Sequence, residues 1–149
     1  MKNYEAKKPS YFATPSPQLI HALHTSLTQI LSKSLEERFA TQKKVSQQVK
    51  EHIGKLGLKQ LASKPENQAN GMTTMYLPEG VTPPDVLPLL AKRGVVFAGG
   101  LHKEIAQKYI RFGHMGVSVV DDKRRGDIQK ALDALDGAIA EAKKGKSSS

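Results

Sequence analysis

A glycine-flanked segment in the last third of the chain carries its most chemically informative side chain, Arg111. The segment reads Lys-Tyr-Ile-Arg-Phe-Gly-His-Met-Gly over residues 108–116. Alternate side chains of a strand share a face, so Ile110 and Phe112 would lie opposite Tyr109 and Arg111. A guanidinium group there could bind a carboxylate or a phosphate through two parallel hydrogen bonds. The alternative is an arginine on the solvent face of a sheet, and the segment alone leaves both open.

Two other places offer ligand contacts, each with a simpler structural explanation. Gly99 and Gly100 follow an apolar run and would let a ligand pass close to the backbone, but a turn with positive φ also needs glycine. Tyr11 and Thr14 present two hydroxyl groups just before a predicted helix, whose N-terminus attracts anions such as phosphate. Packing and local capping would explain these two residues equally well.

The histidines do not form a recognisable metal-ligand pattern. His21 and His24 could share a helix face, but no carboxylate completes a triad and the sequence has no His-Glu-x-x-His motif. His102 and His114 could meet only across a loop. The chain contains no cysteine, which removes thiolate ligands, disulfides and cysteine nucleophiles. We therefore expect no metal site.

Composition favours an ordinary globular protein with a basic surface. The 149 residues fit one domain, or one compact domain with appendages, and no apolar run reaches the ~18–20 residues of a membrane helix. The formal charge is +9, but basic residues are spread along the chain and aromatic residues make up only 5%. We expect solvated faces and tails rather than a nucleic-acid or membrane surface. The basic N-terminus lacks an apolar stretch behind it, so we expect an intracellular protein.

Helical periodicity alternates with short apolar runs. Ser16 before Pro17 is typical of a helix start, and Ser34 with Glu37 matches a capping box for a second helix. The pattern predicts helices over 17–32, 34–56, 82–93 and from 122 onward, and strands over 72–77, 95–98 and 109–112. The economical packing is an α/β fold of the two-layer α+β kind. It has a small, mostly antiparallel sheet of about three strands with helices on one face, preceded by a long helix.

Five short motifs, in this order and spacing, resemble the C-terminal part of pyridoxal-phosphate-dependent class V aminotransferases of the alanine–glyoxylate type. The fungal members are the most similar. The motifs are Tyr-Phe-Ala-Thr-Pro at 11–15, Leu-Glu-Glu-Arg-Phe at 35–39, Gly-Met-Thr at 71–73, Val-Val-Phe-Ala-Gly-Gly-Leu at 95–101 and Tyr-Ile-Arg-Phe-Gly-His-Met-Gly at 109–116. The resemblance extends from residue 11 to about residue 140.

The resemblance implies a role for each candidate residue. Arg111 would bind the α-carboxylate of a small amino or oxo acid, such as alanine, serine or glyoxylate. Gly99 and Gly100 would line the substrate side of the cleft. Tyr11 and Thr14 would contact the phosphate of pyridoxal phosphate across the interface of a homodimer, in the partner's site. The fold would be the C-terminal small domain of fold-type I pyridoxal-phosphate enzymes.

The resemblance also implies that the catalytic centre lies elsewhere. In the family, the lysine that holds the cofactor as a Schiff base belongs to a large upstream domain, and members are more than twice this length. A Schiff-base lysine must be desolvated, whereas the lysines here are expected in tails and on polar helix faces. We expect residues 1–33 to be a remnant of the large-domain end with an interface helix, 34–144 the small domain, and 145–149 a polar tail.

We therefore expect a chain that is inactive by itself, in the cytoplasm, mitochondrion or peroxisome. One alternative is a non-catalytic α/β binding module that uses its basic surface for an acidic partner. Another is a regulatory fragment that dimerises with the full-length enzyme.

Overall fold

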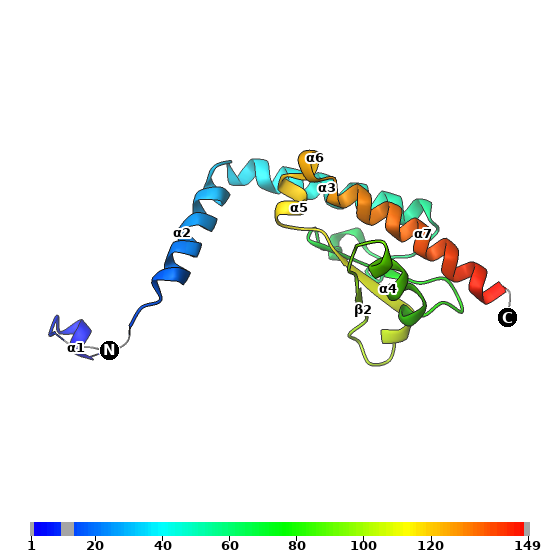
Figure 1. Cartoon of the computed structure of the whole chain (residues 1–149), viewed down its shortest axis with the longest axis horizontal. Helices are drawn as coiled ribbons and strands as arrows, with labels where there is room; N and C mark the ends of the chain where they lie inside the picture. The colour runs from blue at the N-terminus through cyan, green and yellow to red at the C-terminus, as the bar shows by residue number, and fades with distance from the viewer. Residues whose placement is uncertain (1, 10–13, 148–149) are drawn as a thin grey trace. The chain divides into compact units, whose positions relative to one another are not determined.

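The structure, a computed structural model, describes residues 2–9 and 14–147, and the chain divides into two compact units between Leu35 and Glu36. The first unit contains α1 (Lys2–Glu5) and α2 (Pro17–Leu31) (Figure 1). Ser16 has extended backbone angles at the N-cap of α2, and Pro17 opens the helix. The helix predicted over 17–32 is confirmed.

Helix α2 exposes its apolar stripe. It contains no aspartate, glutamate, lysine or arginine, and none of its residues is buried. The exposed apolar side chains are Leu19, Ile20, Leu23, Leu27, Ile30 and Leu31. Although it is apolar, α2 is short, and no helix in the described residues is both long and apolar enough to cross a membrane.

The second unit is built on a three-stranded antiparallel sheet, as predicted. Its strands are β1 (Met72–Tyr76), β3 (Tyr109–Gly113) and β2 (Ala98–Gly99), in the order β1-β3-β2. Thr74 and Ala98 are the cross-strand partners of Arg111 on either side of β3. The outer edge of β1 is covered by residues 59–61, whose Leu61 N–H donates to the carbonyl of Thr74.

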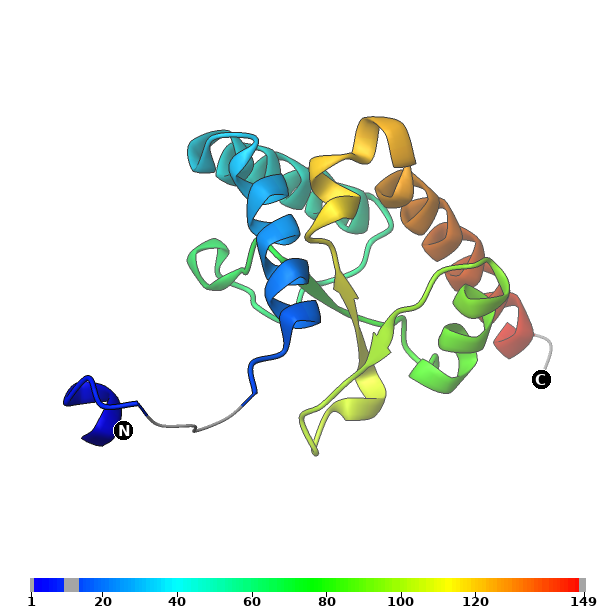
Figure 2. The same ribbon diagram turned by 60° about the vertical axis from the view of Figure 1, so that its left-hand side comes forward.

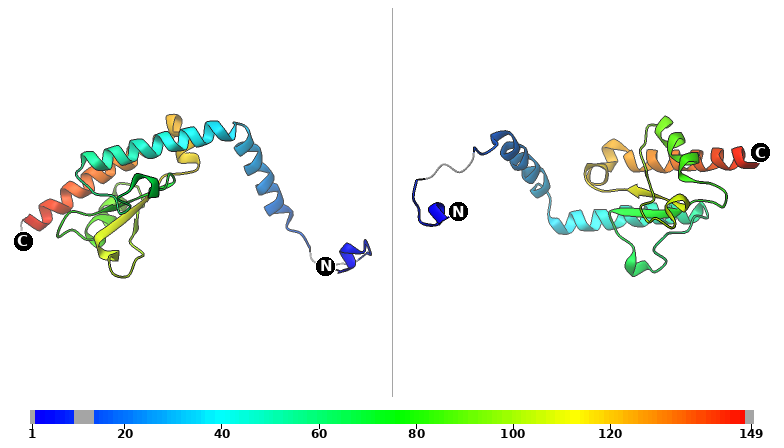
Figure 3. Two further views of the ribbon diagram at one scale, coloured as in Figure 1. Left: turned by 180° about the vertical axis from the view of Figure 1, so that it is seen from behind. Right: turned by 90° about the horizontal axis from the view of Figure 1, so that it is seen from below.

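The hydrophobic core lies on one face of this sheet. Helices α3 (Leu35–Lys55) and α7 (Asp127–Ser147) run along the same side of the sheet (Figure 3). The main core side chains are Val49 and Ile53 of α3, Met75 of β1, Ile110 and Phe112 of β3, and Ile128, Leu132, Leu135 and Ile139 of α7. Because Ile110 and Phe112 are buried here, their alternating neighbours must point to the opposite face.

Helix α4 (Pro83–Lys92) completes the covered side. The carboxylate of Asp85 accepts hydrogen bonds from the backbone N–H and the hydroxyl of Thr82, at 2.8 and 2.7 Å. The helix is joined to α7 by an ion pair between Asp85 and Lys146, at 3.2 Å, and by another between Arg93 and Glu141, at 2.7 Å. These contacts confirm the helix predicted after Thr82.

The strand predicted over 95–98 is mostly wrong. Only Ala98 and Gly99 pair with β3. Gly94 has a positive φ of 76°, and the N–H of Val95 bonds back to the carbonyl of Leu90 at 3.2 Å. The backbone therefore leaves α4 at an angle that keeps 95–97 off the ladder, and the side chain of Val96 is 90% exposed.

The final helix does not start at Asp122 without a break. The chain leaves β3 through α5 (Val117–Val120) and α6 (Asp122–Arg125), then turns at Gly126 with φ 65° before α7 begins (Figure 2). Helix α7 continues to Ser147, into the segment expected to be a polar tail. Short 3₁₀ turns occur at η1 (Pro65–Asn67) and η2 (Ala106–Lys108).

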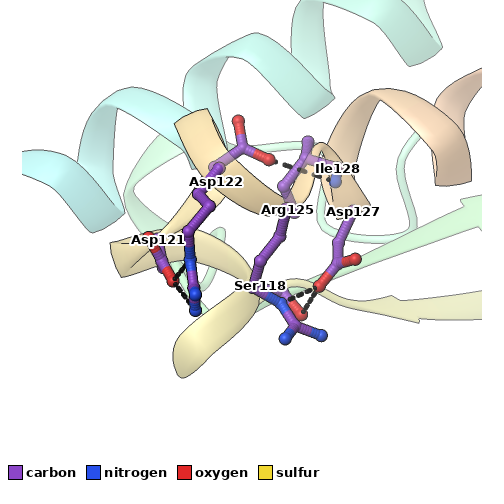
Figure 4. A network of polar contacts seen from close by, with 7 residues as sticks. Ser118, Asp121, Asp122, Arg125, Asp127 and Ile128 are labelled. Atoms are coloured by element: carbon purple, nitrogen blue, oxygen red, sulfur yellow. Dashed lines mark hydrogen bonds and ion pairs between the residues drawn. The ribbon is translucent and has the colours of Figure 1, made fainter.

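A polar network fixes this junction (Figure 4). One carboxylate oxygen of Asp127 accepts from the hydroxyl of Ser118 at 2.9 Å and from Nε of Arg125 at 2.6 Å. Asp122 accepts from the backbone N–H of Ile128 at 3.3 Å. Carboxylates at a helix N-terminus satisfy free amides and favour the local dipole, so the network holds the start of α7 against α5 and α6.

The position of the core predicts the stability of two variants. Leu135→Ala should lower the free energy of unfolding by about 2–5 kcal/mol, because Leu135 is fully buried and its truncation leaves a cavity. Leu101→Ala, at a leucine that is 73% exposed, should change it by less than about 0.5 kcal/mol. Denaturant unfolding of both variants makes the comparison, and equal losses would contradict the assignment of the core.

Candidate functional site

The face of the sheet opposite the core carries a row of half-buried side chains. Thr74, Arg111 and Ala98 are direct cross-strand partners, so they project to the same side of the three strands. In the next register position Tyr76 is the partner of Tyr109. This confirms the prediction that Arg111 and Tyr109 lie opposite Ile110 and Phe112. Hereafter this side is called the open face.

Arg111 is tied to the backbone of β2. Its Nε donates a 2.7 Å hydrogen bond to the carbonyl oxygen of Gly99. Within residues 2–9 and 14–147, no carboxylate or other acceptor bonds to its terminal nitrogens Nη1 and Nη2. Arg111 as a residue is half-buried. The geometry thus provides an oriented, uncompensated cation whose remaining donors can bind an oxyanion.

The two candidate glycines differ in their surroundings. Neither Gly99 nor Gly100 has a positive φ, so the alternative of a left-handed turn is wrong for both. A Cβ at Gly100 would lie 2.6 Å from the carbonyl oxygen of Ala106 and 2.7 Å from Cε1 of Tyr109. A Cβ at Gly99 would make only ordinary contacts, 3.8 and 3.9 Å from the side chains of Leu87 and Pro83. Gly100 is therefore required for close packing, and Gly99 contributes its carbonyl to the Arg111 contact.

Tyr109 is the residue of this site to which sequence reasoning assigned no role. Its hydroxyl oxygen accepts hydrogen bonds from the backbone N–H groups of Leu101, at 2.8 Å, and His102, at 3.2 Å. The amides of His102 and Leu101, with the nearby charge of Arg111, lower the pKa of the buried phenol. The sequence feature that could have indicated a role for Tyr109 is its position two residues before Arg111, which puts both side chains on one face of the strand.

His114 lies in the core and not on the open face. The side chain is fully buried, its Nε2 is hydrogen bonded to Oγ1 of Thr73 at 2.8 Å, and its ring meets Phe112 edge-on. Its Nδ1 has no hydrogen-bond partner among the described residues. Burial lowers the pKa of this imidazole, and the charge of Lys50 lowers it further. His102 is exposed on the loop after β2.

The described residues contain no group of three or more His, Asp or Glu side chains placed to hold a metal ion. Thr14 is exposed and belongs to the first unit, and Tyr11 lies outside the described residues. Their contact with a cofactor phosphate therefore stays a prediction.

Lys50 is the one lysine that is not exposed, and every lysine of the chain lies in the described part. Burial lowers the pKa of its ammonium group, which is a property that a Schiff-base lysine needs. However, Lys50 is on α3, on the core side with His114, whereas Arg111 projects from the opposite face of the sheet. The sheet itself separates this lysine from the guanidinium group.

The contrast between the two glycines can be measured directly. Gly100→Ala should lower the free energy of unfolding by about 1–3 kcal/mol, because the added methyl group meets backbone atoms that cannot move independently. Gly99→Ala is the matched control and should change it by less than about 0.5 kcal/mol. Similar losses in denaturant unfolding would show that the packing around Gly100 is not as tight as described.

The burial of His114 predicts a component of acid instability. Below its ordinary value of 6.5 the unfolded chain binds a proton that the folded chain does not, because the folded-state pKa is lowered. Stability should fall with decreasing pH by about 1.4 kcal/mol per pH unit, until the pH reaches the folded-state pKa. His114→Gln, which retains a side-chain partner for Thr73, should lack this component. Unfolding midpoints measured from pH 7 to 5 make the test, and parallel profiles for the two proteins would contradict it.

Several known proteins similar to this chain are aminotransferases. No model of a protein family matches the sequence. The chain is 44% identical over 120 residues to alanine–glyoxylate aminotransferase 1 of Saccharomyces cerevisiae, which covers 79% of this chain and 30% of the yeast protein. It is 30% identical over 105 residues to serine–glyoxylate aminotransferase of Hyphomicrobium methylovorum, covering 70% of this chain and 26% of that protein.

Solved structures show the same fold. Pyridoxamine–pyruvate aminotransferase of Mesorhizobium loti superposes with a TM-score of 0.78 at 25% identity, covering 95% of this chain and 35% of that one. Alanine–glyoxylate aminotransferase of Nostoc superposes with a TM-score of 0.75 at 26% identity, covering 87% and 33%. The chain thus spans about a third or less of the length of the proteins it matches. Within that span, sequence and fold agree: the chain belongs to the alanine–glyoxylate aminotransferase family and corresponds to its C-terminal part.

Proposed function

We propose that this chain is the substrate-carboxylate-binding domain of a pyridoxal-phosphate-dependent aminotransferase that uses glyoxylate and a small amino acid such as alanine or serine. The observation that carries the proposal is Arg111, a half-buried cation oriented by Gly99 with its terminal nitrogens uncompensated in the described residues. The names of the relatives support glyoxylate as the common substrate.

Arg111 acts in this proposal by orienting the substrate. Two parallel N–H···O bonds from Nη1 and Nη2 fix the plane of a carboxylate, and thereby the direction of the bond to its α-carbon. Partial burial strengthens the attraction, because the effective dielectric is lower than that of water. Gly99 contributes its carbonyl, which holds the guanidinium group, while its missing side chain would point to Leu87 and Pro83 on the core side of the sheet.

In this proposal the described residues do not supply the tether for pyridoxal phosphate. Tethering that cofactor requires a desolvated lysine near the substrate. Lys50 is the one lysine that is not exposed, and it lies on the other side of the sheet from Arg111. We therefore infer that the tether and the residues that tune the cofactor come from another part of the enzyme, and that this chain alone does not turn over substrate. In a homodimer, Tyr11 and Thr14 would contact the cofactor phosphate of the partner's site.

The proposal predicts weak carboxylate binding without catalysis. The purified chain should bind glyoxylate with a dissociation constant on the order of millimolar, followed through the Nε–Hε resonance of Arg111 by NMR. Arg111→Gln should weaken binding by about 10–100-fold, as expected for loss of charge-assisted hydrogen bonds. The control is Arg124→Gln, which removes an equal charge at a residue paired with Asp121.

Turnover is tested separately. Incubation with pyridoxal phosphate, alanine and glyoxylate should give neither the absorbance of a protein-bound Schiff base nor amino transfer. Transfer by the isolated chain would refute the inference that the tether lies elsewhere, and undiminished glyoxylate binding by Arg111→Gln would refute the role of Arg111.

A further inference from the structure

Strand β3 sends two side chains onto one short segment of backbone after β2. Arg111 bonds to the carbonyl of Gly99, and Tyr109 accepts from the amides of Leu101 and His102. The segment 99–102 is therefore held at both ends by neighbouring side chains of the same strand. Because residues i and i+2 of a strand share a face, both contacts are made from the open face.

The hydroxyl of Tyr109 is a hydrogen-bond acceptor for two backbone amides that do not pair with a neighbouring strand. Strand β2 pairs with β3 only at Ala98 and Gly99, so the ladder has ended where Leu101 and His102 begin. Their amides converge instead on a single phenol oxygen. The Tyr109 side chain is only 4% exposed, and Cε1 of its ring would lie 2.7 Å from a Cβ at Gly100. The ring is held by this packing, which fixes the position of its hydroxyl oxygen.

We propose that Tyr109 is a positioning residue for Arg111: its hydroxyl fixes the segment 99–102, and the Gly99 carbonyl of that segment orients the guanidinium group for a carboxylate. This inference rests on the proposed function and deepens it. An arginine side chain loses several rotatable degrees of freedom when it binds a ligand, and a fixed acceptor on Nε removes part of that loss in advance. Without the Tyr109 hydroxyl, the Gly99 carbonyl would move with a loop that has lost two of its hydrogen bonds.

The two side chains are also coupled through charge. The charge of Arg111 is one of the causes that lower the pKa of the Tyr109 phenol. A carboxylate bound at Arg111 would neutralise that charge, so the pKa of Tyr109 should rise when the site is filled. A purely structural tyrosine, remote from the ligand, would not respond in this way.

The test compares Tyr109→Phe with Tyr76→Phe in the full chain. Tyr76 is the cross-strand partner of Tyr109 on the open face and is half-buried. Its hydroxyl makes no hydrogen bond with the described residues. Tyr76→Phe therefore deletes the same atom as Tyr109→Phe without removing such a contact. Tyr109→Phe should weaken glyoxylate binding about 3–10-fold, and should speed hydrogen exchange at Arg111 Nε–Hε and at the amides of Leu101 and His102. Tyr76→Phe should leave all three unchanged.

A measurement on the unaltered chain covers the case in which Tyr109→Phe fails to fold. The NMR titration of Tyr109 should give a higher pKa with saturating glyoxylate than without it, and an unchanged pKa would overturn the proposal. Undiminished glyoxylate binding by a folded Tyr109→Phe, with Arg111 Nε–Hε still slow to exchange, would overturn it as well and leave the proposed function standing. If the unaltered chain does not bind glyoxylate through Arg111, the proposed function itself fails.

Discussion

The antiparallel register that places β3 between β1 and β2 is the constraint on which the rest of the second unit depends. Ile110 and Phe112 are buried against α3 and α7, and this burial fixes which side chains of β3 face outward. A shift of one residue would exchange the faces, placing Arg111 in the core and exposing Ile110. The apolar contacts of the core therefore hold the cation in position, although none of them touches the open face.

Local patterns predicted the parts of this structure that local physics controls. The apolar stripe of α2 and the Ser16-Pro17 step at its N-terminus predicted the limits of that helix. The alternation of side chains along a strand predicted that Arg111 and Ile110 lie on opposite faces of the sheet. The strand predicted over 95–98 is mostly wrong, because strand propensity does not indicate whether a partner strand is within reach. Gly94 and the Val95 amide direct that segment away from β3.

The candidate site was only partly predictable for a related reason. Arg111 could be identified by residue type and by its glycine-rich setting, but its acceptor on Gly99 and the Tyr109 contacts depend on how β2 lies against β3. The need for glycine at position 100 arises from Ala106 and Tyr109, which the chain brings back only after a loop. A glycine pair in the sequence does not reveal whether glycine is needed for close packing or for ligand access. Here Gly100 is required for close packing, whereas Gly99 provides the carbonyl that accepts from Arg111.

The shortness of β2 has a consequence for the order in which parts of the protein open. Regions with few ladder bonds unfold locally at lower free energy than the core strands beside them. Strand β2 has two paired residues, whereas β3 has five partners along β1. We therefore expect the segment that carries this acceptor to open locally at a lower free energy than the core strands. A ligand that binds only the closed arrangement would shift this local equilibrium toward the closed state. Ligand binding at Arg111 and closing of the sheet edge are therefore thermodynamically coupled.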